Sequence, residues 1–170
     1  PDTTACPVCV EQTGAQWQGL SIEEPAVEYV LDSPVYMIYT SGSTGLPKGT
    51  IIHHRGLINL LEWYIKTLGI QALDSTLIIS SPGFDLTQKN LLSPLLCGAK
   101  VVFPVADFYD VKQFCQIIAE QQISWLNCAP SAFYPLVDLP AGEENTEQRF
   151  QQLTSLRALV LGGEPIVVNK

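Results

Sequence analysis

The sequence predicts an α/β fold with mixed, mostly parallel sheets flanked by helices. Two observations lead to this prediction. Short apolar runs alternate with stretches of helical periodicity, and 46% of the 170 residues are hydrophobic while only 15% are charged. Such a composition is typical of a globular protein with a substantial core. Strands that alternate with helices favour parallel pairing, because each helix returns the chain to the same end of the sheet.

The first two strands are expected to flank a loop. Residues 35–39, Val-Tyr-Met-Ile-Tyr, predict a buried strand, and residues 50–53 return to strand character. Residues 40–49 between them are rich in Gly, Ser and Thr, which predicts a loop. Residues 55–68 carry apolar side chains at helical spacing, and Gly69 is expected to end this helix.

The later elements alternate in the same way. We expect strands over residues 76–80, 100–103, 123–127 and 156–161. We expect helices over residues 86–96, 111–122 and 130–137. Gly98 is predicted to end the first of these helices, Asp110 to be the N-cap of the second, and Pro130 to open the third. The acidic stretch 142–147 is interpreted as a solvated loop.

Charge and cysteine content exclude several classes of protein. The net charge of −8 and the lack of a basic cluster argue against nucleic-acid binding, because phosphates are bound by basic surfaces. The five cysteines are odd in number and widely spaced, unlike a secreted disulfide framework. Cys6 and Cys9 lack the further ligands of a zinc site, so no metal site is expected. No apolar run reaches the ~18 residues of a membrane span. We therefore expect a cytoplasmic protein with free thiols and no membrane partner.

The loop at residues 40–49 reads Thr-Ser-Gly-Ser-Thr-Gly-Leu-Pro-Lys-Gly. Its glycines allow tight turns that bring backbone N–H groups close to a ligand. Its hydroxyl groups can donate to anionic oxygens, and Lys48 adds a mobile positive charge. These groups predict a cradle for a polyphosphate. The spacing differs from a Walker loop, which disfavours a kinase, and a flexible linker would not lie between two apolar strands.

The run from Tyr36 to Gly49 resembles the phosphate-binding loop of the adenylate-forming superfamily, in the form found in adenylation domains of nonribosomal peptide synthetases. Residues 54–57, His-Arg-Gly-Leu, add to the resemblance, which extends over most of residues 30–166. It implies the fold of the large N-terminal subdomain of these enzymes. Because the chain begins at Pro1 and ends just after an apolar strand, residues 1–170 are expected to be part of an adenylation domain, truncated at both ends.

The resemblance implies ATP-dependent activation of an amino acid as its aminoacyl-adenylate, followed by transfer to the phosphopantetheine of a carrier domain. ATP and Mg²⁺ are the implied cofactors, and carrier and condensation domains are the implied partners. The catalytic lysine and the metal ligands are expected downstream of residue 170. In this superfamily the loop handles the β- and γ-phosphates. This implies phosphate contacts for Thr40, Ser41, Ser43, Thr44 and Lys48, and a role in shaping the loop for Gly42, Gly45 and Gly49.

The resemblance also implies a substrate pocket. Residues 83–90 lie at a predicted strand-to-helix junction, where ligands often bind in α/β sheets. Asp85 is implied to hold the α-ammonium group of the substrate, with an N-cap as the structural alternative. The implied side-chain pocket is lined by Leu86, Lys89, Asn127, Val160 and Gly162. If Lys89 and Asn127 face this pocket, an acidic or amide substrate side chain would suit them, because a buried lysine needs a partner.

Other interpretations of these residues stay open. Leu86 and Val160 could be core residues, Lys89 could lie on a solvated helix face, and Asn127 could form a turn. Residues 156–165 resemble the segment that borders the adenine. This assigns Gly163, Glu164 and Pro165 to nucleotide binding, with an ordinary strand and turn as the alternative. His53 and His54 are expected to be structural.

Two further functions also stay open. An acyl- or aryl-CoA ligase of the same superfamily would use a similar loop, but those enzymes usually lack an aspartate at the position of Asp85. A non-catalytic nucleotide-binding module would bind ATP without substrate-dependent pyrophosphate exchange.

Overall fold

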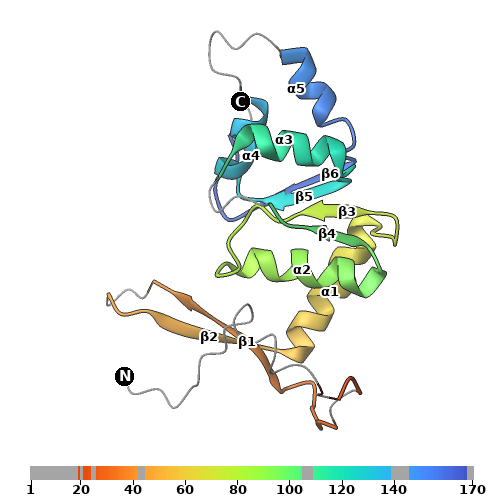
Figure 1. The fold of residues 1–170 in the computed structure, drawn as a ribbon. Coiled ribbons are helices and arrows are strands. Elements are labelled where there is room, and N and C mark those ends of the chain that lie inside the picture. Colours follow the sequence, from red (N-terminus) through yellow and green to blue (C-terminus); the bar gives the residue numbers. More distant parts are fainter. Residues whose placement is uncertain are drawn as a thin grey trace.

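The computed structural model describes residues 19, 21–23, 26–41, 45–104, 109–138 and 146–167 (Figure 1). The elements follow one another in the order β1 (Pro34–Thr40), β2 (Lys48–His53), α1 (His54–Leu68), β3 (Ser75–Leu77), α2 (Asp85–Cys97), β4 (Lys100–Val102), α3 (Val111–Glu120), β5 (Trp125–Cys128), α4 (Pro130–Val137), α5 (Thr146–Gln152) and β6 (Ala158–Leu161).

Four strands form a sheet in the order β4–β3–β5–β6, and all three neighbouring pairs are parallel (Figure 1). Helices carry the chain from one strand to the next, as parallel pairing requires. In the β5–β6 pair, Trp125 lies beside Ala158 and Asn127 lies beside Val160. The predicted α/β fold with a mostly parallel sheet is therefore confirmed.

The sheet has a hydrophobic core on each face. On one face, α3 and α4 pack over a buried cluster that includes Ile118 and Leu126. On the other face, α1 and α2 pack over a cluster that includes Tyr64 and Trp125. Successive side chains of a strand point to opposite faces. Asn127 therefore shares the α1–α2 face with Trp125, and this is the face on which the candidate site lies.

β1 and β2 form an antiparallel hairpin that stands apart from the parallel sheet (Figure 1). Its pairing runs from Pro34 opposite His53 to Thr40 opposite Lys48. A side chain at residue 49 would be crowded, because a Cβ added to Gly49 would lie 2.7 Å from the Sδ of Met37. The antiparallel pairing makes residues 41–47 the tip of this hairpin, so the loop predicted over residues 40–49 is shorter at both ends. The prediction that the strand over residues 35–39 is buried is wrong, because β1 is largely exposed.

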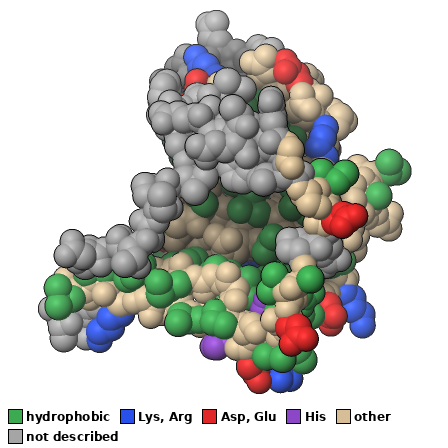
Figure 2. Space-filling view, turned by 60° about the horizontal axis from the view of Figure 1, so that its bottom comes forward, with side chains coloured by type: hydrophobic (Ala, Val, Ile, Leu, Met, Phe, Trp, Pro, Cys, Tyr) green, Lys and Arg blue, Asp and Glu red, His purple; other side chains and the backbone are tan. Residues whose placement is uncertain are grey.

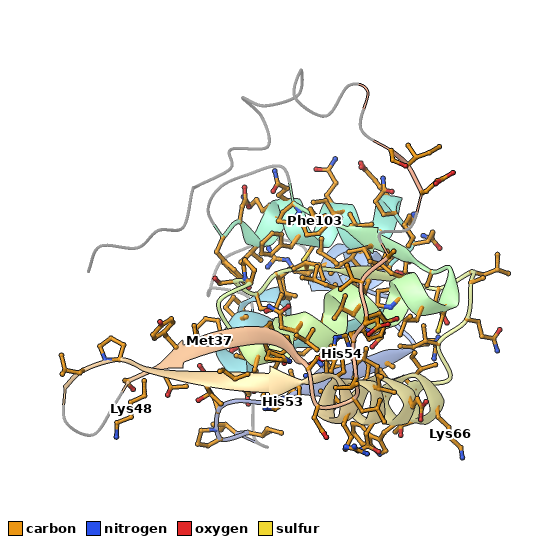
Figure 3. The ribbon with its side chains drawn as sticks, turned by 90° about the horizontal axis from the view of Figure 1, so that it is seen from below. Met37, Lys48, His53, His54, Lys66 and Phe103 are labelled. Carbon is orange, nitrogen blue, oxygen red and sulfur yellow. The ribbon has the colours of Figure 1, made fainter. Side chains whose placement is uncertain are left out.

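The junction between the hairpin and α1 holds both histidines (Figure 3). The Nδ1 of His53 forms a hydrogen bond with the backbone carbonyl oxygen of Asp32. The ring of His54 stacks on Tyr29, with 5.1 Å between the ring centroids. Arg55 adds an ion pair to Asp32 at 3.2 Å. These contacts attach the segment before β1 to the start of α1, which is a structural role.

The helix ends follow the predicted residues closely. Gly69 and Gly98 end α1 and α2 in the left-handed conformation. Asp110 is the N-cap of α3, because its Oδ1 accepts from two backbone N–H groups of the first turn at 2.9 and 3.2 Å. All four strands of the parallel sheet are shorter than predicted, since β3 and β4 end at Leu77 and Val102, and β5 and β6 begin at Trp125 and Ala158. Within the described part of the chain, no helix combines the length and the hydrophobicity that crossing a bilayer requires.

The prediction for residues 142–147 is wrong in part. The interpretation of residues 142–147 as a solvated loop does not hold for Thr146 and Glu147, which begin α5, and residues 142–145 lie outside the described residues. Leu153, just after α5, packs against the core cluster under α3. Short helices depend on such tertiary contacts more than on their own sequence, and a polar stretch does not reveal them.

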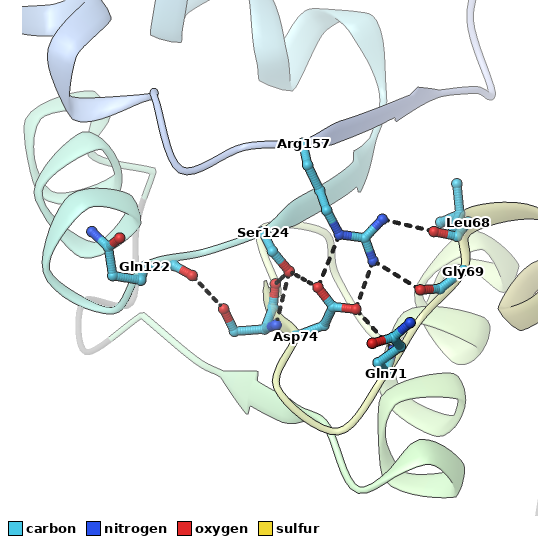
Figure 4. Close-up of polar contacts among 8 residues, drawn as sticks. Leu68, Gly69, Gln71, Asp74, Gln122, Ser124 and Arg157 are labelled. Atoms are coloured by element: carbon cyan, nitrogen blue, oxygen red, sulfur yellow. Dashed lines mark hydrogen bonds and ion pairs between the residues drawn. The ribbon is translucent and has the colours of Figure 1, made fainter.

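An ion pair between Arg157 and Asp74 joins the start of β6 to the turn before β3 (Figure 4). Arg157 donates two hydrogen bonds to the carboxylate, at 2.9 and 2.6 Å, and others to the carbonyl oxygens of Leu68 and Gly69 at 2.7 and 3.3 Å. Ser124 Oγ donates to the same carboxylate at 2.8 Å. The hydrogen bonds from Arg157 hold the pKa of Asp74 below its usual range.

Candidate functional site

A hollow opens between the β1–β2 hairpin and the body of the molecule (Figure 2). Two adjoining pockets form it, and Tyr36 and Asp85 line both of them. One pocket continues along α1 to Lys89 and the turn after β6. The other follows the hairpin toward its loop and reaches Thr40. The hollow therefore connects the predicted phosphate loop with the predicted substrate residues.

Alternation along the hairpin decides which of its side chains face the hollow. Tyr36, Ile38 and Thr40 lie on one face of β1, and they line the pocket together with Thr50 and Ile52 of β2. Burial, and secondarily the charge of Asp85, raise the pKa of the Tyr36 hydroxyl. Tyr36 is absent from the predicted site residues, although the period of two along β1 could have identified it.

The described part of the hairpin loop presents hydroxyl groups and one cation. Thr40 Oγ1 donates to the backbone oxygen of Lys48 at 3.4 Å, which closes the base of the loop. The Lys48 side chain points outward from the hairpin (Figure 3) and has no ion-pair partner among the described residues. Gly45 has a φ of +82°, which favours glycine. Gly42, Ser43 and Thr44, which were also predicted to belong to the phosphate site, lie outside the described residues.

Asp85 is the first residue of α2, and its side chain is exposed to the hollow. The N-cap position belongs to Phe84, so the alternative role of Asp85 as an N-cap does not hold. Its Oδ1 accepts from the backbone N–H of Leu86 at 2.8 Å. The other carboxylate oxygen has no hydrogen-bond partner among the described residues, so it can receive a donor from a ligand.

The turn that presents Asp85 is fixed by a buried threonine. Thr87 is fully buried, and its Oγ1 donates to the backbone oxygen of Ser81 at 2.7 Å. The Ser80 hydroxyl lies 2.7 Å from the same Oγ1. These contacts tie the end of the strand segment to the first turn of α2. Sequence reasoning missed Thr87, because a threonine in the first turn of a helix carries no signal of this bond.

Lys89 lies one helical turn after Asp85 on the same side of α2, and it lines the hollow. Its Nζ donates to the backbone oxygen of Leu86 at 3.3 Å and lies 5.7 Å from the ring centroid of Tyr64. Burial lowers the pKa of Lys89, and the charge of Asp85 opposes part of this effect. Lys89 is therefore not on the solvated helix face that the sequence left open.

The other predicted pocket residues divide into two layers. Leu86 and Gly162 line the hollow beside each other. Asn127 and Val160 are paired strand residues behind it and do not belong to the residues that line the two pockets. Val160 packs against the α1–α2 core. Asn127 is only 2% exposed, yet neither its Nδ2 nor its Oδ1 has a hydrogen-bond partner among the described residues.

The turn after β6 borders the hollow through Gly162 and Gly163. Gly163 has a φ of +86°, a conformation that other residues rarely adopt. The Glu164 carboxylate accepts from the backbone N–H and from the hydroxyl of Ser131 at the start of α4, at 3.0 and 2.8 Å. Glu164 thus fixes this turn from behind. Pro165 is exposed and does not line either pocket.

The described residues do not include a group of three or more His, Cys, Asp or Glu side chains that could hold a metal ion. Cys97, Cys115 and Cys128 are free thiols, and burial raises the pKa of Cys128 to about 12. The predicted Cys6–Cys9 pair lies outside the described residues. The hydroxyl-bearing residues Thr40 and Ser41 and the exposed carboxylate of Asp85 line one hollow, whereas Lys48, paired with Thr40, is not among its lining residues. Hydroxyl donors at one end and a carboxylate at the other suit a ligand that is anionic at one end and cationic at the other.

Comparisons with known proteins identify the family to which the chain belongs. The profile of the AMP-binding enzymes matches residues 3–169. The chain is 31% identical to surfactin synthase subunit 2 of Bacillus subtilis (strain 168) over 161 residues, and 35% identical to tyrocidine synthase 3 of Brevibacillus parabrevis over 165 residues. The alignments cover 94% and 96% of this chain. The chain belongs to the AMP-binding enzyme family, and the predicted resemblance to nonribosomal peptide synthetases is confirmed.

Solved structures agree with this assignment. The AMPPNP-bound form of the nonribosomal peptide synthetase FmoA3 has a TM-score of 0.70 at 27% identity, over 82% of this chain and 14% of that one. The N-terminal domain of FACL13 from Mycobacterium tuberculosis has a TM-score of 0.75 at 19% identity, over 94% of this chain and 38% of that one, which shows a shared fold. The predicted fold of an adenylate-forming N-terminal subdomain is confirmed. The chain spans only 4% and 2% of the surfactin and tyrocidine synthases it matches.

Proposed function

We propose that the protein uses ATP to activate an amino acid as its aminoacyl-adenylate. A carboxylate oxygen of the amino acid forms a bond to the α-phosphorus, and the bond to the bridging oxygen breaks as pyrophosphate leaves. The observation that carries this proposal is the position of Asp85, which faces the same hollow as the hydroxyl-rich hairpin loop. An amine anchor and a polyphosphate cradle on one hollow would align the two reactants, which lowers the entropic part of the barrier.

Each end of the hollow has its own role. At the loop, Thr40, Ser41 and Lys48 would hold the β- and γ-phosphates, together with Ser43 and Thr44, and would neutralise their charge. Gly163 and the turn fixed by Glu164 would lie against the adenine. At the other end, the unpaired oxygen of Asp85 would accept a hydrogen bond from the substrate ammonium group. Mg²⁺ would accompany ATP, but no role proposed for this chain involves a metal ligand.

The side chain of the amino acid would extend toward Lys89. Lys89 has no ion-pair partner among the described residues, and the buried amide of Asn127 lies unpaired in the layer behind. Leu86 and Gly162 would supply the apolar surface of the pocket, with Val160 in the layer behind it. A buried ammonium group gains from a carboxylate or amide oxygen, because its own desolvation is then offset. We therefore propose an acidic or amide amino acid as the substrate.

The relatives suggest the wider setting of the reaction. They are synthases much longer than this chain. Residues 1–170 would accordingly be part of a cytoplasmic adenylation domain, next to carrier and condensation domains of one assembly line. The adenylate would be passed to the thiol of a carrier-bound phosphopantetheine.

ATP–pyrophosphate exchange with the full-length protein tests this proposal. We expect exchange with aspartate, asparagine, glutamate or glutamine, and weak exchange with leucine and valine. Asp85→Asn should raise the KM for the amino acid about 10- to 100-fold, as expected for a lost hydrogen bond to a charged group, and leave the KM for ATP unchanged. Glu120→Gln is the matched control, because it removes an exposed carboxylate far from the hollow.

The alternatives predict different results in the same assay. An acyl- or aryl-CoA ligase would exchange with acids that lack an amino group, and Asp85→Asn would not change their KM. A non-catalytic module would bind ATP and show no exchange with any acid. Exchange that depends only on leucine or valine would overturn the proposed acidic or amide substrate.

A further inference from the structure

A buried line of polar groups connects three elements beneath the hollow. Tyr64 of α1 is 1% exposed, and its hydroxyl donates to the Oδ1 of Asn90 at 3.3 Å. The Nδ2 of Asn90, in α2, donates to the backbone oxygen of Asn127 in β5 at 2.8 Å. Each bond fixes the next side chain, so the Tyr64 ring has one orientation relative to the sheet.

The face of that ring is turned toward Lys89. The Nζ of Lys89 lies 5.7 Å from the ring centroid, within the ~6 Å over which an ammonium group is attracted to an aromatic face. Among the described residues, the ammonium group otherwise has one hydrogen bond, at 3.3 Å to the backbone oxygen of Leu86 in its own helix. An aromatic face can hold a cation without neutralising it, which leaves the charge available to a ligand.

We propose that Tyr64 is a positioning residue, which holds the ammonium group of Lys89 at the wall of the hollow through its ring, and that Asn90 fixes the ring for this purpose. This inference rests on the proposed function only for its last step, in which Lys89 binds the side chain of the substrate. A simple core role for Tyr64 would need neither the ring above Lys89 nor the hydroxyl bond to Asn90.

The ionisation of Lys89 gives a direct test that needs no substrate. Among the described residues, the titratable groups near Lys89 are Asp85 on its own helix, Tyr64 on α1 and Tyr36 on β1, which lines the same pocket. Trp125 of β5, which packs with Tyr64, is neutral. Burial raises the pKa of Tyr64 to about 12, so its ring stays uncharged near neutral pH. Removing the ring should therefore lower the pKa of Lys89, because the charged form loses a stabilising contact.

Competitive labelling with acetic anhydride over a range of pH, followed by peptide mapping, measures this in the full-length protein. We expect Tyr64→Phe, which keeps the ring, to leave the labelling curve of Lys89 unchanged. Tyr64→Leu should move that curve to lower pH. The exposed Lys112 in the same sample is the internal control and should not move. An unchanged Lys89 curve in a folded Tyr64→Leu protein, or an equal shift in Tyr64→Phe, would overturn the proposal.

The wild-type protein provides a second measurement if Tyr64→Leu does not fold. Reductive methylation with ¹³C-formaldehyde gives each lysine an NMR signal, and Lys89→Arg assigns the signal of Lys89. The ring current of Tyr64 should move the methyl protons of Lys89 upfield of those of Lys112. Coincident signals would overturn the proposal.

Substrate kinetics separate this inference from the proposed function. With L-aspartate, L-asparagine, L-glutamate and L-glutamine as probes, Tyr64→Leu should raise the KM about two- to fivefold with little change in kcat. In a Lys89→Met background it should have no further effect, because Tyr64 acts through Lys89. A further rise in the KM when Tyr64→Leu is added to Lys89→Met would contradict the inference that Tyr64 acts through Lys89. If none of these four probes supports exchange in the wild type, the proposed acidic or amide substrate is wrong, while labelling and NMR still decide the role of Tyr64.

Discussion

Replacing Arg157 with methionine tests how much its ion pair with Asp74, which joins the start of β6 to the turn before β3, stabilises the fold. Methionine keeps most of the aliphatic stem and removes the guanidinium group. Four hydrogen bonds are lost, two of them to Asp74. The Asp74 side chain is 13% exposed and that of Arg157 is 40% exposed. Water therefore screens the pair in part, and the loss should lie between the values for exposed and buried pairs, at about 2 kcal/mol.

The unfolding of the full-length protein in urea, followed by pulse proteolysis with peptide mapping, measures this loss. The pKa of Asp74 is lowered in the folded state. Its contribution is therefore fully present above the unfolded pKa of about 3.9 and is lost as the pH falls through the lower, folded pKa. The difference between wild type and Arg157→Met should be constant from about pH 7 down to about pH 4.5 and should narrow below that. A loss no larger than that of Lys112→Met, or one that does not change at low pH, would refute the reasoning.

Three further predictions concern other parts of the structure. Gly49→Ala should raise the KM for ATP in pyrophosphate exchange, because the added Cβ would lie 2.7 Å from the Sδ of Met37 in the hairpin that carries the loop. Adding Met37→Ala to the same protein should restore the KM, and a KM that stays high would argue against crowding. Asp110→Ala should lower the stability measured by pulse proteolysis by about 1 kcal/mol, and Asp110→Asn should lower it much less, because asparagine also caps helices. Iodoacetamide at about pH 8 should modify Cys97 before the buried Cys128, whose pKa is raised to about 12, and peptide mapping that finds Cys128 modified first would contradict this.

The sequence predicted helix ends well at residues whose chemistry favours one local structure. Gly69 and Gly98 mark helix ends because the left-handed conformation is open to glycine, and Asp110 marks a helix start because its carboxylate accepts backbone N–H groups. The helix α5 has no such signal, since its contacts come from Leu153 and the neighbouring helices. The strand ends were also set by pairing, as β3 stops at Leu77 where β4 stops beside it.

Site residues were predictable from the sequence where the residue type and its position in the chain were enough to indicate a role. Asp85, Lys89 and Gly162 do line the hollow, in keeping with their predicted positions. Tyr36 was missed, although it lies on the same face of β1 as Ile38 and Thr40, and the period of two along the strand could have identified it. Tyr64 required the approach of α1 to α2 across residues far apart in the chain, so its ring looked like any other core aromatic.

If the substrate is an amino acid, as we propose, α2 carries both the residue that would bind its common part and residues that would bind its variable side chain. Every amino acid presents the same ammonium group, and Asp85, which we propose to hold it, is placed by the buried bonds of Thr87 rather than by the pocket wall. Leu86 and Lys89 lie one and four positions later, on the side of the helix that lines the hollow. Substitution of Lys89 should therefore change which side chain is accepted without moving Asp85. The polar layer of Tyr64 and Asn90 would limit such changes, because a new side chain at residue 89 must still pack on the ring that now meets an ammonium group.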